Sequence, residues 1–506
     1  MNALERDASE LLCLLRSLKN FFVPINRIPP EVLSLIPDYF HKHYADQVTI
    51  RLTHVCSGWR EIFISRSSLW TCLDFKNVDK TRTYIHRSGH SPLDLSLEDR
   101  ESRPYLDDAF SLVIPQIHRL RSLTVCANDS GPILKHFHSR APLLQELHIQ
   151  LPSHRQILDS NLFDGDFSSL RKLCLSGIKT QLPWNNMVNL RVFNLSYSLL
   201  RHVTVTRLLN FFESSPLLHT IALRGSIPDL FDAPPERIVV LPHLKILAIT
   251  VEPERSILKH LHVPPGASVN VLAGFSGERS PLLDYLPETS SNLKNLFHIV
   301  KLNLSFDPES KCIQLVGPSG ALRLVARRED EAPPSMILDH RILHSFDSSI
   351  LSTIQRLAVA NYVHHNPVKA QECPVFQTLL STNHLRTLIL SNCVHKPFIS
   401  ALNPQKNSSQ HVLCPNLEEF VIYSASWGRT ESLIKMAKGR AQRGAKLLSI
   451  VMIFLDASLP KEDISKLEEY VMNVKCVHRL QLPFWDDLSS EIESRFRKRL
   501  VSYPGW

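Results

Sequence analysis

The sequence predicts an α/β protein that begins with a small helical unit and continues as a long series of short parallel strands joined by helical or irregular returns. Three observations predict this class. Short apolar blocks separated by prolines lie between 24 and 70, a leucine pattern recurs every 20 to 32 residues, and three strand-like segments follow one another between 298 and 326. The first predicts helices, the second a stacked sheet, and the third a β-meander that interrupts the sheet.

The composition is that of a protein with a sizeable core and no membrane segment. Of 506 residues 43% are hydrophobic, and 57 Lys and Arg against 49 Asp and Glu give a net charge of +8, a mild excess that implies no polyanionic partner. The ten cysteines form no C-x-x-C pair, which disfavours disulfides and zinc. Since no apolar run of about 18 residues and no signal peptide is found, we expect a cytoplasmic or nuclear protein without a membrane partner.

The first predicted element is an amphipathic leader helix over residues 4–23, which Pro24 ends. Acidic residues at its start oppose insertion into an anionic membrane surface, so we expect a helix that packs against protein. Its apolar stripe consists of Leu4, Leu11, Leu15, Leu18 and Phe22.

Three short helices are predicted next. Pro29–Pro30–Glu31 starts the first, because proline is tolerated in a first turn and a carboxylate is favoured near the positive end of the helix dipole. Pro37 halts this helix after two turns. The second spans 47–56, and the third begins at Trp59 and ends near 65.

This segment resembles an F-box. The family pattern opens with Leu-Pro-x-Glu-Ile or Val, continues to Val-Cys-x-x-Trp-Arg and ends at Leu-Trp, and the chain matches it at 28–32, 55–60 and 69–70. Ile28 replaces the usual leucine, and Pro37 replaces an aromatic or aliphatic residue, which predicts a shortened first helix. Together with its leader, the segment looks like the F-box-like proteins expanded in fungi.

The remainder of the chain carries the pattern L-x-x-L-x-L, whose period is that of leucine-rich repeats. Each unit is a strand with a return that cannot bury its apolar face alone, so stacked neighbours share one core. The pattern starts at Leu120, Leu144, Leu170, Leu190, Leu218 and Leu244, and again at Ile354, Leu385, Leu417, Leu447 and Val477.

The predicted strands alternate, with apolar Leu147 and Ile149 between polar Glu146, His148 and Gln150. A doubly wound parallel sheet buries both faces and needs nearly continuous apolar strands. The alternation therefore favours an irregular horseshoe-shaped solenoid with one open, concave face.

Between 262 and 345 the leucine pattern lapses. Segments 298–306, 311–316 and 321–326 are predicted as strands of a β-meander, and the sequence leaves open whether this region is an insertion or a distorted part of the solenoid. The expected organisation is a leader at 1–24, an F-box at 25–72, repeats at 73–261, the β-rich interruption at 262–345, and repeats with a C-terminal cap at 346–506.

The resemblance implies a function in protein binding. F-boxes dock on the Skp adaptor of Skp–cullin–F-box ubiquitin ligases, so the expected partners are that adaptor, through it a cullin, and an unknown protein substrate. Trp70 is expected inside the helical unit because it introduces a strand. The expected adaptor contacts are Ile28, Pro29, Glu31, Val32, Leu33, Ile36, Val55 and Trp59.

The residues between the leucines are expected on the concave face, where they would contact the substrate. Their mixed chemistry indicates a folded protein partner, and the ligase chemistry would belong to other subunits. The expected substrate-contact residues are Glu146, His148, Lys172, Asn194, Ser196, Arg224, Thr387, Glu419, Tyr423 and Arg479.

No phosphate loop, H-E-x-x-H, G-x-S-x-G or kinase signature is present in the sequence, so we expect neither an enzyme nor a cofactor or metal site. Two other functions stay open. Pro37 supports a leucine-rich-repeat scaffold or sensor with a degenerate F-box and no ligase role. The basic cluster at 495–499 supports a nucleic-acid-associated protein, which we rank last.

Overall fold

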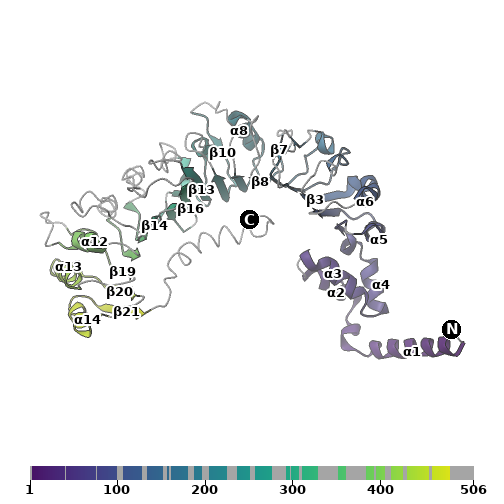
Figure 1. The fold of residues 1–506 in the computed structure, drawn as a ribbon, viewed down its shortest axis with the longest axis horizontal. Helices are drawn as coiled ribbons and strands as arrows, with labels where there is room; N and C mark the ends of the chain where they lie inside the picture. The colour runs from purple at the N-terminus through teal and green to yellow at the C-terminus, as the bar shows by residue number, and fades with distance from the viewer. Residues whose placement is uncertain are drawn as a thin grey trace. The chain divides into compact units, whose positions relative to one another are not determined.

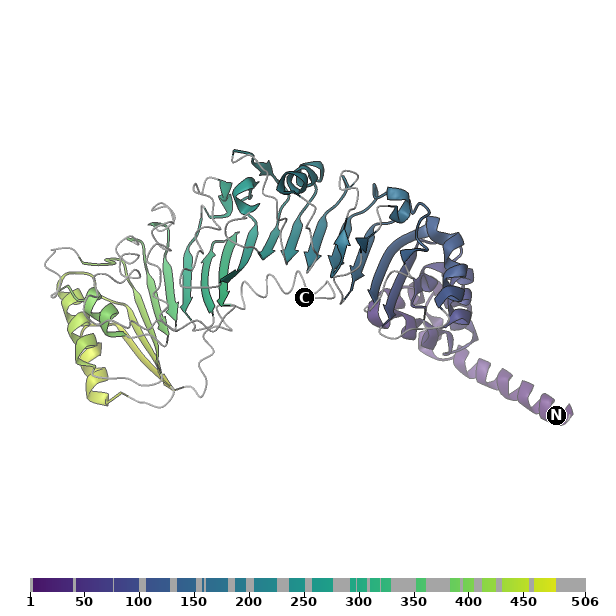
Figure 2. The ribbon, with the colours of Figure 1, turned by 45° about the horizontal axis from the view of Figure 1, so that its top comes forward.

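The structure is a computed structural model of a mixed α/β protein with mostly parallel strands (Figures 1 and 2). The chain forms two compact units, Met1–Leu199 and Leu200–Trp506. The structure describes residues 3–39, 42–75, 77–99, 106–127, 134–151, 157–158, 161–180, 187–196, 204–224, 236–250, 257–275, 292–296, 298–306, 310–318, 320–328, 352–360, 383–391, 395–404, 412–424, 430–454 and 459–478.

The first unit begins with helices, as the proline pattern predicts. The predicted first helix of the box is only one turn long and is followed by a 3-10 turn that contains Pro37, because proline supplies no N–H for a continuing α-helix. The helical elements are α1 (Ala3–Phe21), η1 (Pro24–Arg27), α2 (Pro30–Leu33), η2 (Ile36–Tyr39), α3 (Lys42–Thr53), α4 (Ser57–Ser65) and η3 (Ser67–Trp70).

A parallel sheet follows in the same unit, with its strands in chain order. It contains β1 (Cys72–Leu73), β2 (Leu93–Asp99), β3 (Leu120–Ala127), β4 (Glu146–Gln150), β6 (Lys172–Ser176) and β8 (Val192–Ser196). The connections contain α5 (Val78–Ser88), α6 (Leu106–Val113), η4 (Ile114–Arg119), η5 (Leu162–Gly165) and the small strand pair β5 (Ile157–Leu158) and β7 (Lys179–Thr180).

The leucine pattern sets the register of this sheet. Leu123, Leu147, Leu173 and Phe193 are direct neighbours on successive strands, and all four are fully buried. Each strand therefore contributes one side chain to a continuous core, which is the arrangement that the repeat spacing predicts.

The second unit contributes mostly parallel strands as well. Its strands are β9 (Thr220–Arg224), β11 (Ile246–Thr250), β13 (Ser268–Phe275), β14 (Lys301–Phe306), β15 (Ser310–Val316), β16 (Ala321–Arg328), β17 (Arg356–Ala360), β18 (Thr387–Ser391), β19 (Glu419–Ser424), β20 (Ser449–Phe454) and β21 (Asn473–His478). The connections contain α8 (Val205–Ser214), β10 (Val239–Val240), η8 (Ile257–His260), β12 (Leu261–His262), η10 (Lys294–Leu296), α12 (His395–Leu402), α13 (Glu431–Gln442) and α14 (Lys461–Glu468).

The three strands β14, β15 and β16 form an antiparallel meander inside this sheet, in reverse spatial order. β16 pairs in parallel with β13, and β14 pairs in parallel with β17. The spatial order is therefore β13, β16, β15, β14, β17. After β13 the chain passes over the places of two strands to form β14, and then returns through β15 to form β16 next to β13. The meander is part of the main sheet, and among the described strands of that sheet only β15 runs antiparallel to its neighbours.

A glycine permits this return. The backbone of Gly320, just before β16, lies so close to the turn before β13 that a Cβ atom would stand 2.3 Å from the carbonyl oxygen of Pro265. Ala321 then donates its N–H to the Ala267 carbonyl at 3.1 Å and starts the β13–β16 ladder. Only a residue without a side chain fits this approach.

Helices α12, α13 and α14 lie on one side of β18–β21 in the second unit (Figure 1). The last strand corrects the predicted register. Val477 pairs with Ile453, whereas Asn473 pairs with Ser449, so the position equivalent to Leu447 is the buried Val471. The final repeat therefore runs from Leu447 to Val471 and is shorter than predicted.

Candidate functional site

The helical unit, residues 24–70, has a core of its own. Leu33 from α2 and Trp59 and Phe63 from α4 are buried at its centre, and Ile28 and Ile36 pack against them. Such a small core leaves little apolar surface inside for the other helical residues.

Several apolar side chains of the helical unit consequently lie outside that core. Val32 on α2 and Val55 after α3 are each about half exposed, at 51% and 52%. Leu35 and Ile50 are exposed as well. Four exposed aliphatic side chains are unfavourable in water on so small a unit.

The expected adaptor contacts therefore divide into two sets. Pro29, Glu31, Val32 and Val55 are exposed, and Ile28 and Ile36 are half-buried. Leu33 and Trp59 are 2% and 6% exposed, so they have no surface to offer a partner and act by holding the helices together. Trp70 is buried as expected, and its Nε1 donates to the Phe63 carbonyl at 3.0 Å.

In the first unit, the expected substrate residues lie on the sheet face that points away from the leucine core, which we call the alternate face. Glu146 and Lys172 are neighbours on β4 and β6, with 3.9 Å between Oε2 and Nζ. Asn194 on β8 accepts a hydrogen bond from the Ser196 hydroxyl at 2.9 Å. Asn194 pairs with Cys174, so it lies in the next row of this face, beyond the paired Glu146 and Lys172.

His148 and Cys174 pair directly across β4 and β6 on this face. Burial, helped by the charge of Lys172, lowers the pKa of His148 to about 4. Burial raises the pKa of the Cys174 thiol to about 11. An activated cysteine needs the opposite shifts, a thiolate beside an imidazolium, so this pair does not form a nucleophile at neutral pH.

In the second unit, the alternate face carries an apolar cluster that the sequence does not lead one to expect. Ala358 and Ala360 on β17, Ile389 on β18 and Val421 on β19 are buried together, and Tyr423 packs against them. The polar residues predicted there lie beside this cluster, where Thr387 donates its hydroxyl to Glu419 Oε2 at 3.3 Å.

The reversed meander adds a polar row to the same face. Asn270, Arg323, Gln314 and Asn303 stand side by side on β13, β16, β15 and β14. Asn303 and Gln314 are almost fully buried, and the amide nitrogen of Asn303 donates to Gln314 Oε1 at 3.2 Å.

This polar row contains unsatisfied groups and lies beside two further cations. Buried Oδ1 atoms of Asn270 and Asn303 and buried Nε atoms of Arg323 and Arg356 have no hydrogen-bond partner among the described residues. Lys301 and Arg356 occupy directly paired positions on β14 and β17. Unsatisfied buried polar atoms are costly, so this row is destabilising as it stands.

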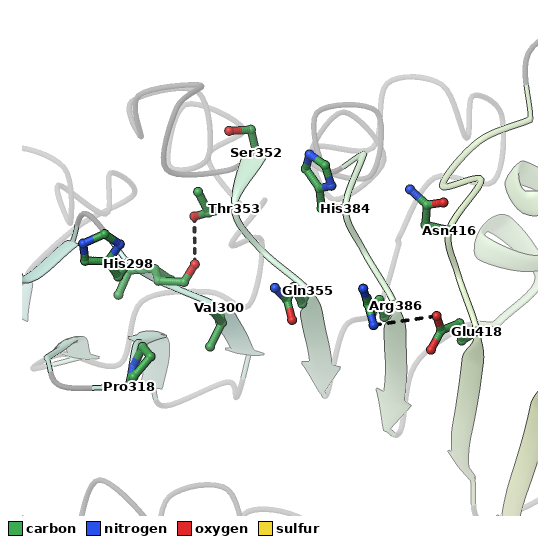
Figure 3. A pocket seen from close by; sticks show the side chains of 11 residues that line it. His298, Val300, Pro318, Ser352, Thr353, Gln355, His384, Arg386, Asn416 and Glu418 are labelled. Atoms are coloured by element: carbon green, nitrogen blue, oxygen red, sulfur yellow. Dashed lines mark hydrogen bonds and ion pairs between the residues drawn. The ribbon is translucent and has the colours of Figure 1, made fainter.

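A pocket of about 630 Å³ lies at the end of the sheet where β14, β17, β18 and β19 begin (Figure 3). The backbones of Val300, Gln355, Arg386 and Glu418 are hydrogen-bonded in sequence, so these residues form a row. Arg386 Nη1 lies 3.9 Å from Glu418 Oε1. The remaining lining is mostly polar and includes His298, Pro318, Ser352, Thr353, His384 and Asn416.

The expected substrate residues are divided between the two units. Glu146, His148, Lys172 and Asn194 belong to the first unit. In the second unit, Arg224 lies on β9, the strand at one end of the described ladder, whereas Thr387, Glu419 and Tyr423 lie on β18 and β19. Arg479 falls outside the described residues.

The residues that sequence reasoning missed are those of the polar row, the apolar cluster and the pocket. A signal for the row was present, because Asn303, Gln314 and Arg323 each stand between two apolar residues of a predicted strand. The pocket residues flank the first apolar residue of each repeat, as His384 and Arg386 flank Leu385. Neither signal says which strands become neighbours.

Within the described residues, no group of three or more His, Cys, Asp or Glu side chains is placed to hold a metal ion. None of the helices in that part of the chain combines the length and the hydropathy that a bilayer crossing requires. In comparisons with known proteins, no family model matches the sequence, and no curated protein matches it.

Proposed function

We propose that the chain is the substrate receptor of a Skp–cullin–F-box type ubiquitin ligase. In this proposal the helical unit is an F-box that binds the Skp adaptor, and the strands and returns of both units are leucine-rich repeats that bind a protein substrate. The chain itself supplies proximity and orientation, while the transfer chemistry belongs to other subunits.

The observation that carries the proposal is the exposed apolar surface of the helical unit. The core of this unit consists of Leu33, Trp59 and Phe63. Four aliphatic side chains lie outside it and are exposed: Val32, Leu35, Ile50 and Val55. Adding adaptor helices would remove this aliphatic surface from water, which is the usual driving force for helix docking.

The alternate face of the second unit supports a protein as substrate. An apolar cluster beside amides and cations matches a polypeptide segment that presents an apolar side chain next to carboxylates. Carboxylates of such a segment would pair with the guanidinium groups of Arg323 and Arg356, whose Nε atoms have no hydrogen-bond partner among the described residues.

One observation favours a second candidate, a repeat scaffold whose box no longer binds the adaptor. α2 is a single turn, and Pro37 lies in the 3-10 turn that follows it. A partner that grips a longer first helix would find less surface here.

The test is binding of the full chain to purified Skp adaptor, measured by titration calorimetry. The variant V32D/V55D places two charges on the exposed surface, and we expect it to lower the affinity at least about 100-fold because a carboxylate at an apolar interface loses its hydration. Leu33 is unsuitable for this purpose, since a charge in the core would unfold the unit.

The control variant is V188D/V240D, which changes two valines of similar exposure, 49% and 58%, outside the helical unit. It should bind like the wild type. If wild-type protein with a folded helical unit shows no binding to the adaptor, the receptor proposal is wrong and the scaffold is favoured. Equal losses in both variants would also contradict it.

A further inference from the structure

Helix α1 exposes an unusually apolar surface. Six of its large side chains and the residue that follows its end are 48–70% exposed. They are Leu11, Leu12, Leu14, Leu15, Leu18, Phe21 and Phe22. All of them except Leu12 lie within one stripe about 120° wide, since successive residues of an α-helix are about 100° apart.

The helix is anchored at its C-terminal end. The side-chain nitrogen of Asn26 donates to the Asn20 carbonyl at 2.7 Å, while Asn26 Oδ1 accepts a hydrogen bond from Trp59 Nε1 at 2.8 Å. Trp59 belongs to the core of the helical unit. One asparagine therefore ties the end of α1 to that core, and the stripe is presented on a fixed element.

The charges of α1 are segregated along its length. Glu5, Asp7 and Glu10 lie in the first half, with Arg6 as the one cation among them, and Arg16 and Lys19 lie in the second half. The first half is thus net acidic and the second half basic. An antiparallel partner of the same sequence would place each acidic half against a basic half, whereas a parallel partner would place like charges together.

We propose that α1 pairs with α1 of a second copy of this chain, antiparallel, with the two leucine stripes face to face. The pairing removes both stripes from water. It also places the positive end of each helix dipole beside the negative end of the other, which is favourable. Helices of 19 residues bury a small area, so the dissociation constant should be on the order of micromolar. The proposal does not depend on binding of the Skp adaptor.

The test is the oligomeric state of the full chain by sedimentation equilibrium, at concentrations from about 1 to 100 µM. We expect a reversible monomer–dimer equilibrium in the wild type. The variant L11E/L18E, which places charges in the stripe, should be monomeric throughout. The control S9E/S17K adds two charges at exposed positions outside the stripe, each of the sign of its own half, and should dimerise like the wild type.

Salt distinguishes the two orientations. Screening weakens an antiparallel dimer held by opposite charges and strengthens a parallel one in which like charges meet, so we expect dissociation to increase between about 0.05 and 0.5 M NaCl. Charge reversal adds a second readout. The variants R16E/K19E and E5K/E10K should each be monomeric alone and should form a heterodimer when mixed.

Three results would overturn the proposal: a wild-type chain that stays monomeric at about 100 µM, an L11E/L18E chain that still dimerises, or a dimer that salt strengthens. Adaptor binding that is lost in L11E/L18E, with wild-type protein monomeric, would assign the stripe to the adaptor instead.

Discussion

His148 shows how one side chain on the sheet can control stability. It lies on β4 opposite Cys174 and near Lys172, and burial together with the lysine charge lowers its pKa from 6.5 to about 4. In the unfolded chain the imidazole titrates near 6.5. Between these values the unfolded state binds more protons, so the free energy of unfolding decreases as the pH falls.

We therefore expect the wild type to lose up to about 3 kcal/mol of stability between pH 6.5 and 4 through this residue, and H148Q to lose correspondingly less. Urea unfolding at pH 7, 5.5 and 4 measures the difference. The control H118Q changes an exposed histidine of the same unit and should follow the wild-type profile. Parallel pH profiles for H148Q and wild type would contradict the assignment.

At the scale of elements, small polar residues before the leucine pattern link neighbouring turns. Ser169 donates to the Pro142 carbonyl, and Asn416 donates to the Asn383 carbonyl, at 2.7 and 3.1 Å. The Thr353 hydroxyl also donates to a neighbouring turn, to the Ile299 carbonyl at 2.8 Å. Each bond joins turns that are more than twenty residues apart, so the repeat spacing alone does not reveal it.

The return of the meander depends on Gly320 in the same way. We expect G320A to cost about 2–4 kcal/mol, because its Cβ would clash with the Pro265 carbonyl, 2.3 Å away, and the strand must shift. G266A is the matched control. It lies in the adjacent turn with open space around its Cβ position and should stay within about 1 kcal/mol of the wild type. Chemical denaturation compares the two, and equal effects would refute the close approach.

At the scale of the molecule, each unit is a stack in which a strand contacts its immediate neighbours. Leu147 in β4 is flanked by Leu123 and Leu173, and Leu357 in β17 is flanked by Leu302 and Leu388. All are fully buried. In such stacks the stability is the sum of local and nearest-neighbour contributions.

We expect L147A and L357A each to cost about 2–5 kcal/mol locally through the cavity that forms. Hydrogen exchange should increase most in the mutated strand and its neighbours, β3 and β6 for L147A, and β14 and β18 for L357A. The distant strands should show a smaller increase in exchange: β1 in L147A, and β21 in L357A. A uniform increase across a unit would show that it unfolds as one block.

The sequence by itself determined the strands of the leucine pattern from β3 to β20 and their core side, because alternation of period two and the leucine pattern are local properties. It also located the helical unit, with Pro37 shortening its first helix, and three strands of the meander. Two residues of the candidate site were assigned differently from the structure, since Leu33 and Trp59 fit an apolar pattern equally well as contacts or as core.

Only the tertiary structure decided which strands become neighbours. The order β13–β16–β15–β14–β17 places Asn270, Arg323, Gln314 and Asn303 in one row, although these residues come from strands in a different chain order. It likewise decided that the last repeat starts at Val471 instead of Val477. Strand pairing depends on backbone hydrogen bonds and close contacts between residues that are far apart in the sequence, such as the approach of Gly320 to Pro265. Local periodicity carries no information about it.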